Sequence, residues 1–102
     1  MLFVGQDTMT LMIDVSQTET GDPLEFSVTV REGDSETHHS VTMAESTYQK
    51  LTSGAVPPEQ CIEGAFKFLL EREPKESILS RFDVTVISKY FPDFESQLSR
   101  YL

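Results

Sequence analysis

The segment from Pro57 to Phe82 constrains the fold most, because it carries the densest apolar periodicity in the chain. Pro57 and Pro58 can open a helix, whereas Pro74 cannot continue one. The charged residues between them occupy one face, which predicts a helix over Pro57–Glu73 that packs against the rest of the chain. The apolar stripe with i, i+3, i+4, i+7 spacing consists of Cys61, Ile62, Ala65, Phe66, Phe68 and Leu69.

The residues before this helix alternate in hydropathy with a period of two, which is typical of half-buried strands. We expect strands over Met9–Val15, Leu24–Arg31 and Glu36–Met43. A polar loop is predicted over Ser16–Pro23, and the Gly-containing segment Glu32–Ser35 is predicted to close a hairpin. For residues 2–4 a further strand and a frayed end both remain open.

Short helices are predicted on either side of the main helix. Thr42 and Glu45 have the spacing of a capping box, so a helix is expected to start there and to stop at Gly54. Residues 77–82 are expected to form a helical turn or two. Asp83 is the expected N-cap of a helix over residues 83–91, although the Val-Thr-Val-Ile run leaves a strand open. A final short helix is expected around Phe94, Leu98 and Tyr101.

These elements predict an α+β fold in a single domain, residues 1–102, strand-rich over 1–43 and helical over 44–102. The expected architecture is a small antiparallel three-stranded sheet (a meander) followed by three to four helices that pack on one face. A chain of 102 residues is large enough for one such core.

The net charge of −9 is unevenly distributed. Residues 1–70 hold eleven acidic and three basic side chains (−8), and residues 71–102 hold six and five (−1). Such a charge makes nucleic acid and anionic membranes unfavourable partners. The charge either increases solubility or forms an acidic face for a basic partner, and both interpretations remain open. The chain has no apolar run of membrane-spanning length and no signal-peptide pattern, so we expect a cytoplasmic protein without a membrane partner.

No residue pattern predicts catalysis, a metal or another cofactor. Cys61 is the only cysteine and lies on the predicted buried face, flanked by acidic residues that disfavour a reactive thiol. His38 and His39 are adjacent in a predicted strand and therefore point to opposite faces. Asp34, Glu36 and His38 share a face, but three polar residues beside a hairpin are typical of its solvated side. We therefore expect a protein that is not an enzyme.

Residues 66–102 hold seven of the ten aromatic residues. They either complete the core or leave a contact surface for a protein partner or a second copy of the chain, and both interpretations remain open. Under the second interpretation, the residues expected to contact the partner are Tyr90, Phe94 and Tyr101.

Residues 77–90 also match the layout of a helix-turn-helix, with the turn at Asp83. In a DNA-binding regulator or antitoxin-like module, Thr85, Ser88 and Lys89 would then face the DNA groove. The turn lacks the frequent glycine, and residues 71–102 carry no net positive charge to neutralise phosphates. DNA binding is therefore the alternative prediction, after protein interaction.

The segments FLLEREPKESIL (Phe68–Leu79) and FDVTVISKYFPDFE (Phe82–Glu95) resemble those of a group of short bacterial proteins of unknown function. In that group a β-rich front half also precedes an F-L-L-E-R-E-P segment and a Y-F-P segment. The resemblance, over roughly residues 25–98, implies a bacterial cytosolic protein and transfers no catalytic or binding residue. The strand-then-helix order is also similar to that of acidic antitoxin-type modules, by layout alone. Together these features predict a non-enzymatic interaction or regulatory domain that makes its contacts through the C-terminal helices.

Overall fold

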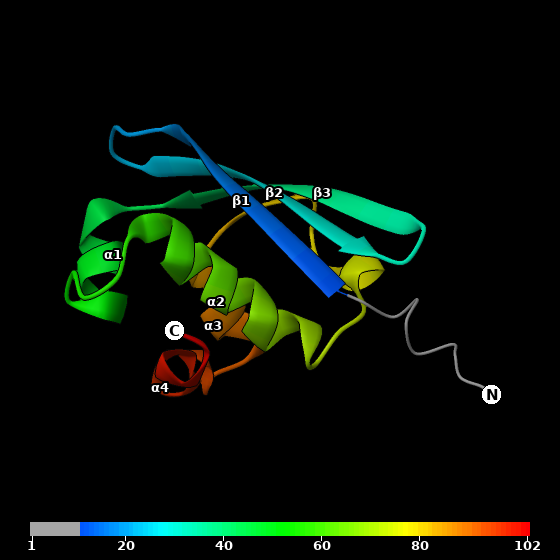
Figure 1. The fold of residues 1–102 in the computed structure, drawn as a ribbon. Coiled ribbons are helices and arrows are strands. Elements are labelled where there is room, and N and C mark those ends of the chain that lie inside the picture. Colours follow the sequence, from blue (N-terminus) through cyan, green and yellow to red (C-terminus); the bar gives the residue numbers. More distant parts are fainter. Residues whose placement is uncertain (1–10) are drawn as a thin grey trace.

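The computed structural model describes residues 11–102 and has an α+β fold, as the sequence predicts (Figure 1). The predictions for residues 2–4, and for Met9 and Thr10, lie outside these residues. The elements in chain order are β1 (Leu11–Glu19), β2 (Leu24–Glu32), β3 (Ser35–Met43), α1 (Glu45–Thr52), α2 (Pro58–Leu70), the 3₁₀ turn η2 (Lys75–Ser77), β4 (Arg81–Asp83), α3 (Thr85–Tyr90), α4 (Phe94–Gln97) and the 3₁₀ turn η3 (Leu98–Tyr101).

The sheet has four strands in the order β1-β2-β3-β4, so the predicted three-stranded meander is wrong in one respect. The pairs β1–β2 and β2–β3 are antiparallel as expected, but β4 pairs in parallel with β3. Residues 77–82 therefore do not form the predicted helical turns. Two backbone bonds flank the new strand: the Ser40 amide donates to the Ser80 carbonyl (2.8 Å) and the Val84 amide to the Thr42 carbonyl (2.9 Å).

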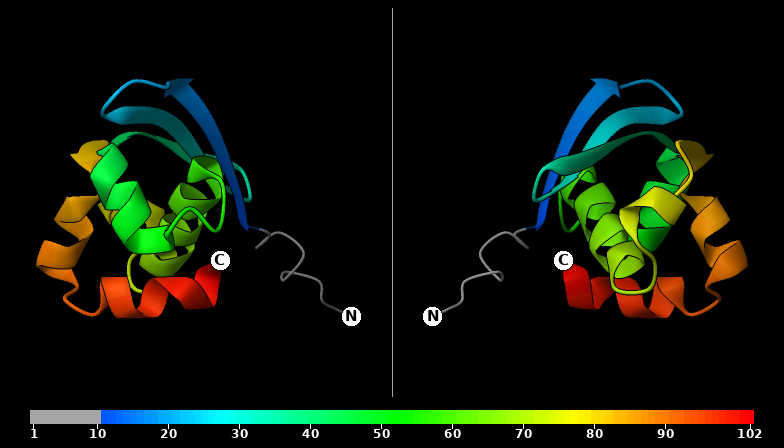
Figure 2. Two further views of the ribbon diagram at one scale, coloured as in Figure 1. Left: turned by 90° about the vertical axis from the view of Figure 1, so that its left-hand side faces the viewer. Right: turned by 90° about the vertical axis from the view of Figure 1, so that its right-hand side faces the viewer.

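Helices cover one face of the sheet, and the opposite face is open to solvent (Figures 1 and 2). Helix α2 crosses beneath the strands and buries its whole predicted stripe, including Cys61, Phe66 and Phe68. The inward residues of the central strands, such as Phe26 and Val41, are equally buried. The alternation predicted for β2 and β3 and the helical stripe are thus confirmed, and they meet in one core.

Strand β1 is longer than predicted, because it continues through Glu19 into the expected polar loop. Ser16 lies opposite Ser27 and Gln17 opposite Phe26, with an irregularity in the register between Gln17 and Glu19. These residues have little apolar area to bury, so backbone pairing with β2 extends the strand where hydropathy gives no signal.

The predicted capping box does not form. Thr42 ends up within β3, where its hydroxyl donates to an Asp83 carboxylate oxygen (2.6 Å). Helix α1 begins at Glu45, whose amide donates instead to Oδ1 of Asp22 in the β1–β2 loop (3.1 Å). The helix ends near the predicted stop, with Ser53 and Gly54 both at positive φ (54° and 73°).

Candidate functional site

An apolar groove of about 270 Å³ lies beside α3, between the end of α2 and the segment that leads into β4. Phe82, Leu69 and Ile87 are buried at its base, whereas Leu79 and Tyr90 are 50% and 70% exposed. Two such large apolar side chains in solvent beside one hollow are typical of a contact surface. The groove is lined by Leu69, Glu73, Ser77, Ile78, Leu79, Phe82, Val86, Ile87, Tyr90 and Phe91.

The Leu79 side of the groove is fixed to the sheet by a buried histidine. Nδ1 of His39 lies 2.7 Å from the Leu79 carbonyl oxygen, and Nε2 lies 2.8 Å from the Thr37 hydroxyl. A carbonyl can only accept, so Nδ1 carries a hydrogen, and the Thr37 hydroxyl is the hydrogen-bond partner of Nε2. The ring also packs on Phe66, with centroids 5.3 Å apart. His39 thus satisfies both nitrogens while joining β3 to the groove.

The α3 side of the groove is positioned by Asp83. Its carboxylate accepts hydrogen bonds from the Thr42 hydroxyl (2.6 Å), the Thr85 hydroxyl (2.7 Å) and the Thr85 amide (3.1 Å). Burial alone would raise the pKa of Asp83, but these three bonds outweigh it and lower the pKa below its ordinary value. The predicted N-cap residue thus lies one position before the cap, Val84, and links β3, β4 and α3.

The helix predicted over residues 83–91 is confirmed for its main part, and only its first residue, Asp83, belongs to a strand. Arg81–Asp83 is strand and Thr85–Tyr90 is helix. Phe82, from the strand, and Ile87, from the helix, both line the groove. Because the helix begins only two residues after the strand ends, both elements reach the same hollow.

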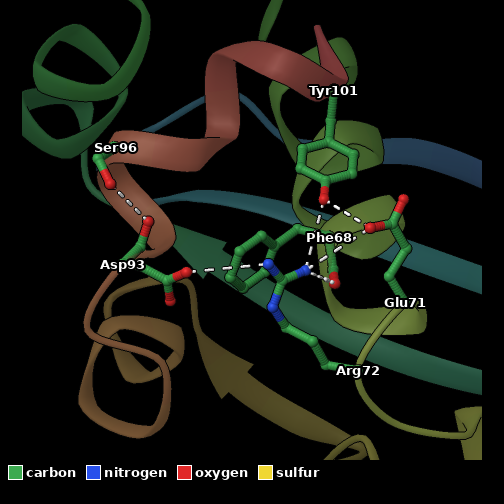
Figure 3. Close-up of polar contacts among 6 residues, drawn as sticks. All are labelled: Phe68, Glu71, Arg72, Asp93, Ser96 and Tyr101. Carbon is green, nitrogen blue, oxygen red and sulfur yellow. Dashed lines mark hydrogen bonds and ion pairs between the residues drawn. The ribbon is translucent and has the colours of Figure 1, made fainter.

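The three predicted partner-contact residues occupy three different environments. Tyr90 is exposed on the rim of the groove, and Phe94 is buried in the core, 1% exposed. Tyr101 is half-buried on η3, with its ring edge-on to Phe68 and its hydroxyl donating to Oε1 of Glu71 (2.7 Å) (Figure 3). Tyr90 is thus the one of the three that lies on the groove.

The predicted DNA-contact residues do not line the groove. Thr85 and Lys89 are exposed on α3 and Ser88 is half-buried, on the side of the helix away from Val86, Ile87 and Tyr90. The first helix of the predicted helix-turn-helix layout is replaced by η2, an extended segment and β4. The layout prediction was wrong because backbone pairing with β3 overrides the helical spacing of residues 77–82.

Other reactive or charged groups serve the fold. Burial raises the pKa of the Cys61 thiol to about 11. Lys75, also buried, donates a hydrogen bond from its Nζ to Glu76 (2.6 Å), and this bond is the main cause that raises the pKa of Lys75. Its Nζ also lies 3.7 Å from Glu32. His38 points to the open face, opposite to His39 as predicted. Residues 11–102 contain no cluster of three or more His, Cys, Asp or Glu side chains that could hold a metal ion.

Leu79, Glu73 and His39 were not identified as site residues from sequence. Sequence placed His39 on the inward face of a strand, but its bond to Leu79 spans forty residues and has no local signal. Leu79 lies within the segment predicted as helical, so its exposure beside Tyr90 depends on β4, which the pattern did not predict. The residue pattern of 77–82 therefore held no signal for this surface.

No protein-family model, curated protein or solved structure matches the chain. The resemblance of residues 68–79 and 82–95 to a group of short bacterial proteins stays a prediction. Within the part of the chain that the structure describes, no helix has both the length and the apolar character needed to cross a membrane.

Proposed function

We propose that the protein is a non-enzymatic interaction domain that binds a protein partner in the groove between α2, the segment 77–82 and α3. The observation that carries this proposal is the pair of exposed side chains, Leu79 and Tyr90, beside a hollow with buried apolar residues at its base. Tyrosine is enriched among the residues that dominate binding energy at interfaces. The cytoplasmic location predicted from sequence is part of this proposal.

The size of the groove supports a protein partner over a small metabolite. Its volume of about 270 Å³ is below the roughly 300–1,000 Å³ typical of small-molecule pockets. A hollow of this size accommodates one or two anchoring side chains of a larger partner. Eight of its ten lining residues are apolar or aromatic, so the anchors would be apolar too.

The proposal is tested with peptides selected by phage display against the wild-type protein. Leu79→Ser and Tyr90→Ala should each weaken their binding at least about tenfold, the effect of an interface hot spot. Leu11→Ser is the matched control, because Leu11 is 42% exposed on β1 and does not line the groove. Peptides that bind all three variants equally, or a selection without binders, would contradict the proposal.

A further inference from the structure

The groove contains one charged residue, and that residue has no charged partner in the described part of the chain. Glu73 lines the hollow and is half-buried, and it takes part in none of the ion pairs found among residues 11–102. The nearest cations along the chain form ion pairs with other acidic residues. Arg72 pairs with Asp93, and Lys75 pairs with Glu32 and Glu76. The apolar groove therefore carries a carboxylate that is available to an incoming cation.

The bases on β4 and α3 do not neutralise this carboxylate. Arg81 pairs with exposed Ser40 on the open face of the sheet, whereas the next residue, Phe82, points into the groove. Lys89 lies on the side of α3 away from the groove-lining residues. The local charge of the groove is thus negative, in keeping with the net charge of −9.

The main chain beside the groove is poorly suited to pairing with a strand of a partner. The carbonyl of Leu79 accepts from His39, and that of Ser80 accepts from the Ser40 amide. Strand β4 has only three residues, which is too short an edge for the continuous ladder that strand addition requires. Recognition through side chains, as when an amphipathic helix enters a groove, remains the suitable mode.

We propose that the groove binds an amphipathic helix of a partner protein, which places apolar side chains over Phe82 and Ile87 and a lysine or arginine against Glu73. This inference rests on the proposed function and adds the chemistry of the partner. The apolar side chains supply most of the affinity, and the cation determines the orientation and selects basic over acidic helices. The acidic charge of the whole protein favours the approach of such a partner.

The inference is tested with a phage-displayed library of amphipathic helical peptides whose polar positions contain acidic and basic residues in equal numbers. Wild-type protein should select a lysine or arginine three or four positions from an apolar anchor. Glu73→Lys should reverse the choice to aspartate or glutamate at that position. Glu25→Lys is the matched control, because it changes the net charge by the same amount as Glu73→Lys. Glu25 is exposed on β2 and makes no ion pair within residues 11–102.

A selected peptide should bind Glu73→Gln at least about tenfold more weakly than wild type, the effect expected when one charge-assisted hydrogen bond is lost. Replacing its lysine or arginine by glutamine should remove that difference. Thermal unfolding of each variant verifies that the fold is intact.

The outcomes distinguish the inference from the proposed function. Binding that depends on Leu79 and Tyr90, without charge selection and without an effect of Glu73→Gln, would overturn the basic helix and leave the groove as an interface. Binding that ignores Leu79 and Tyr90 would overturn both. Peptides that bind in extended form, seen as an absence of helical signal in the bound peptide by NMR, would also overturn the helix.

Discussion

The guanidinium carbon of Arg72 lies 3.7 Å from the centroid of the Phe68 ring (Figure 3). The same ring makes edge-on contacts with Phe91, Phe94 and Tyr101, at centroid distances of 5.8, 5.1 and 5.9 Å. One aromatic residue of α2 thus contacts α4, η3 and the residue that ends α3. Arg72 also lies 3.8 Å from a carboxylate oxygen of Asp93 and donates to the Tyr101 hydroxyl (3.4 Å), so it links the end of α2 to the C-terminal segments.

Arg72→Ala should lower the free energy of unfolding by about 1–2 kcal/mol, because it removes a cation–π contact together with a hydrogen bond to the Phe68 carbonyl (3.0 Å). Arg72→Lys should restore little of this loss, since an ammonium lacks the planar group that stacks on the ring. Urea unfolding of the two variants measures the difference. A lysine variant as stable as wild type would show that charge alone matters here.

Phe66→Ala should cost about 3–5 kcal/mol, a large part of the stability of a domain of this size. Phe66 is fully buried, and its ring lies 5.3 Å from that of His39 and 6.0 Å from that of Phe82. The cavity would therefore open beneath the groove as well as within the core. Equilibrium unfolding measures this loss of free energy. A loss below about 1 kcal/mol would show that Phe66 does not fill the core.

The elements predicted correctly from the sequence are those whose buried residues follow a single periodicity. The buried stripe of α2 and the inward residues of β2 follow from spacing alone, because a helix and a strand each repeat their faces regularly. The stop of α1 near Gly54 likewise follows from local chemistry. These elements carry most of the core, so the α+β class was predictable.

The groove was not predictable, because it depends on contacts between distant residues. Strand β4 has three residues and exists through pairing with Ser40–Thr42, about forty positions earlier. Thr42 shows the same limit: its spacing to Glu45 matches a capping box, yet its hydroxyl binds Asp83 instead. Local propensity gives no information on which of two such partners a hydroxyl will contact.

Asp83→Asn should destabilise the protein by about 1–2 kcal/mol at neutral pH, because the amide replaces a carboxylate that accepts three hydrogen bonds. The pKa of Asp83 is lowered in the folded protein, so its contribution is present above the unfolded pKa, near 3.8, and is lost as the pH falls through the folded pKa. The gap between wild type and variant should therefore close in acid.

Urea unfolding at pH 7 and at pH 2 measures this gap. Asp34→Asn is the control, since Asp34 is exposed in the hairpin turn and no hydrogen bond to its carboxylate is found among residues 11–102. A difference between wild type and Asp83→Asn that persists unchanged at pH 2 would mean that shape, rather than charge, sets the role of this residue.

Cys61 should react with a thiol reagent at neutral pH only as fast as the protein opens, because its thiol is buried and its pKa is raised to about 11. The folded pKa lies above the ordinary value of 9.0, so the unfolded chain ionises first and stability falls as the pH rises between these values. Cys61→Ala should remove that alkaline component. Labelling at the rate of a free thiol in native buffer would place Cys61 at the surface.

Replacing Gly64 of α2 by alanine should destabilise the protein, although alanine favours a helix by up to about 1 kcal/mol over glycine. A Cβ at this position would lie 2.7 Å from Cδ2 of Leu102, 3.3 Å from the Tyr101 carbonyl oxygen and 3.4 Å from Cδ1 of Leu98. The leucine ends can rotate away, whereas the backbone oxygen requires a shift of η3 itself. We expect Gly64→Ala to destabilise the protein by about 1–2 kcal/mol net.

A double-mutant cycle tests the assignment to this contact. Leu102→Ala removes the closest atom, so Gly64→Ala should cost less in that background than in wild type, with a coupling of at least about 0.5 kcal/mol. Leu79→Ala is the control background, since Leu79 lies at the groove and does not approach Gly64. If Gly64→Ala lowers the stability equally in all three backgrounds, the strain lies in the contact with the Tyr101 backbone alone. If Gly64→Ala stabilises the protein, η3 does not pack this closely on α2.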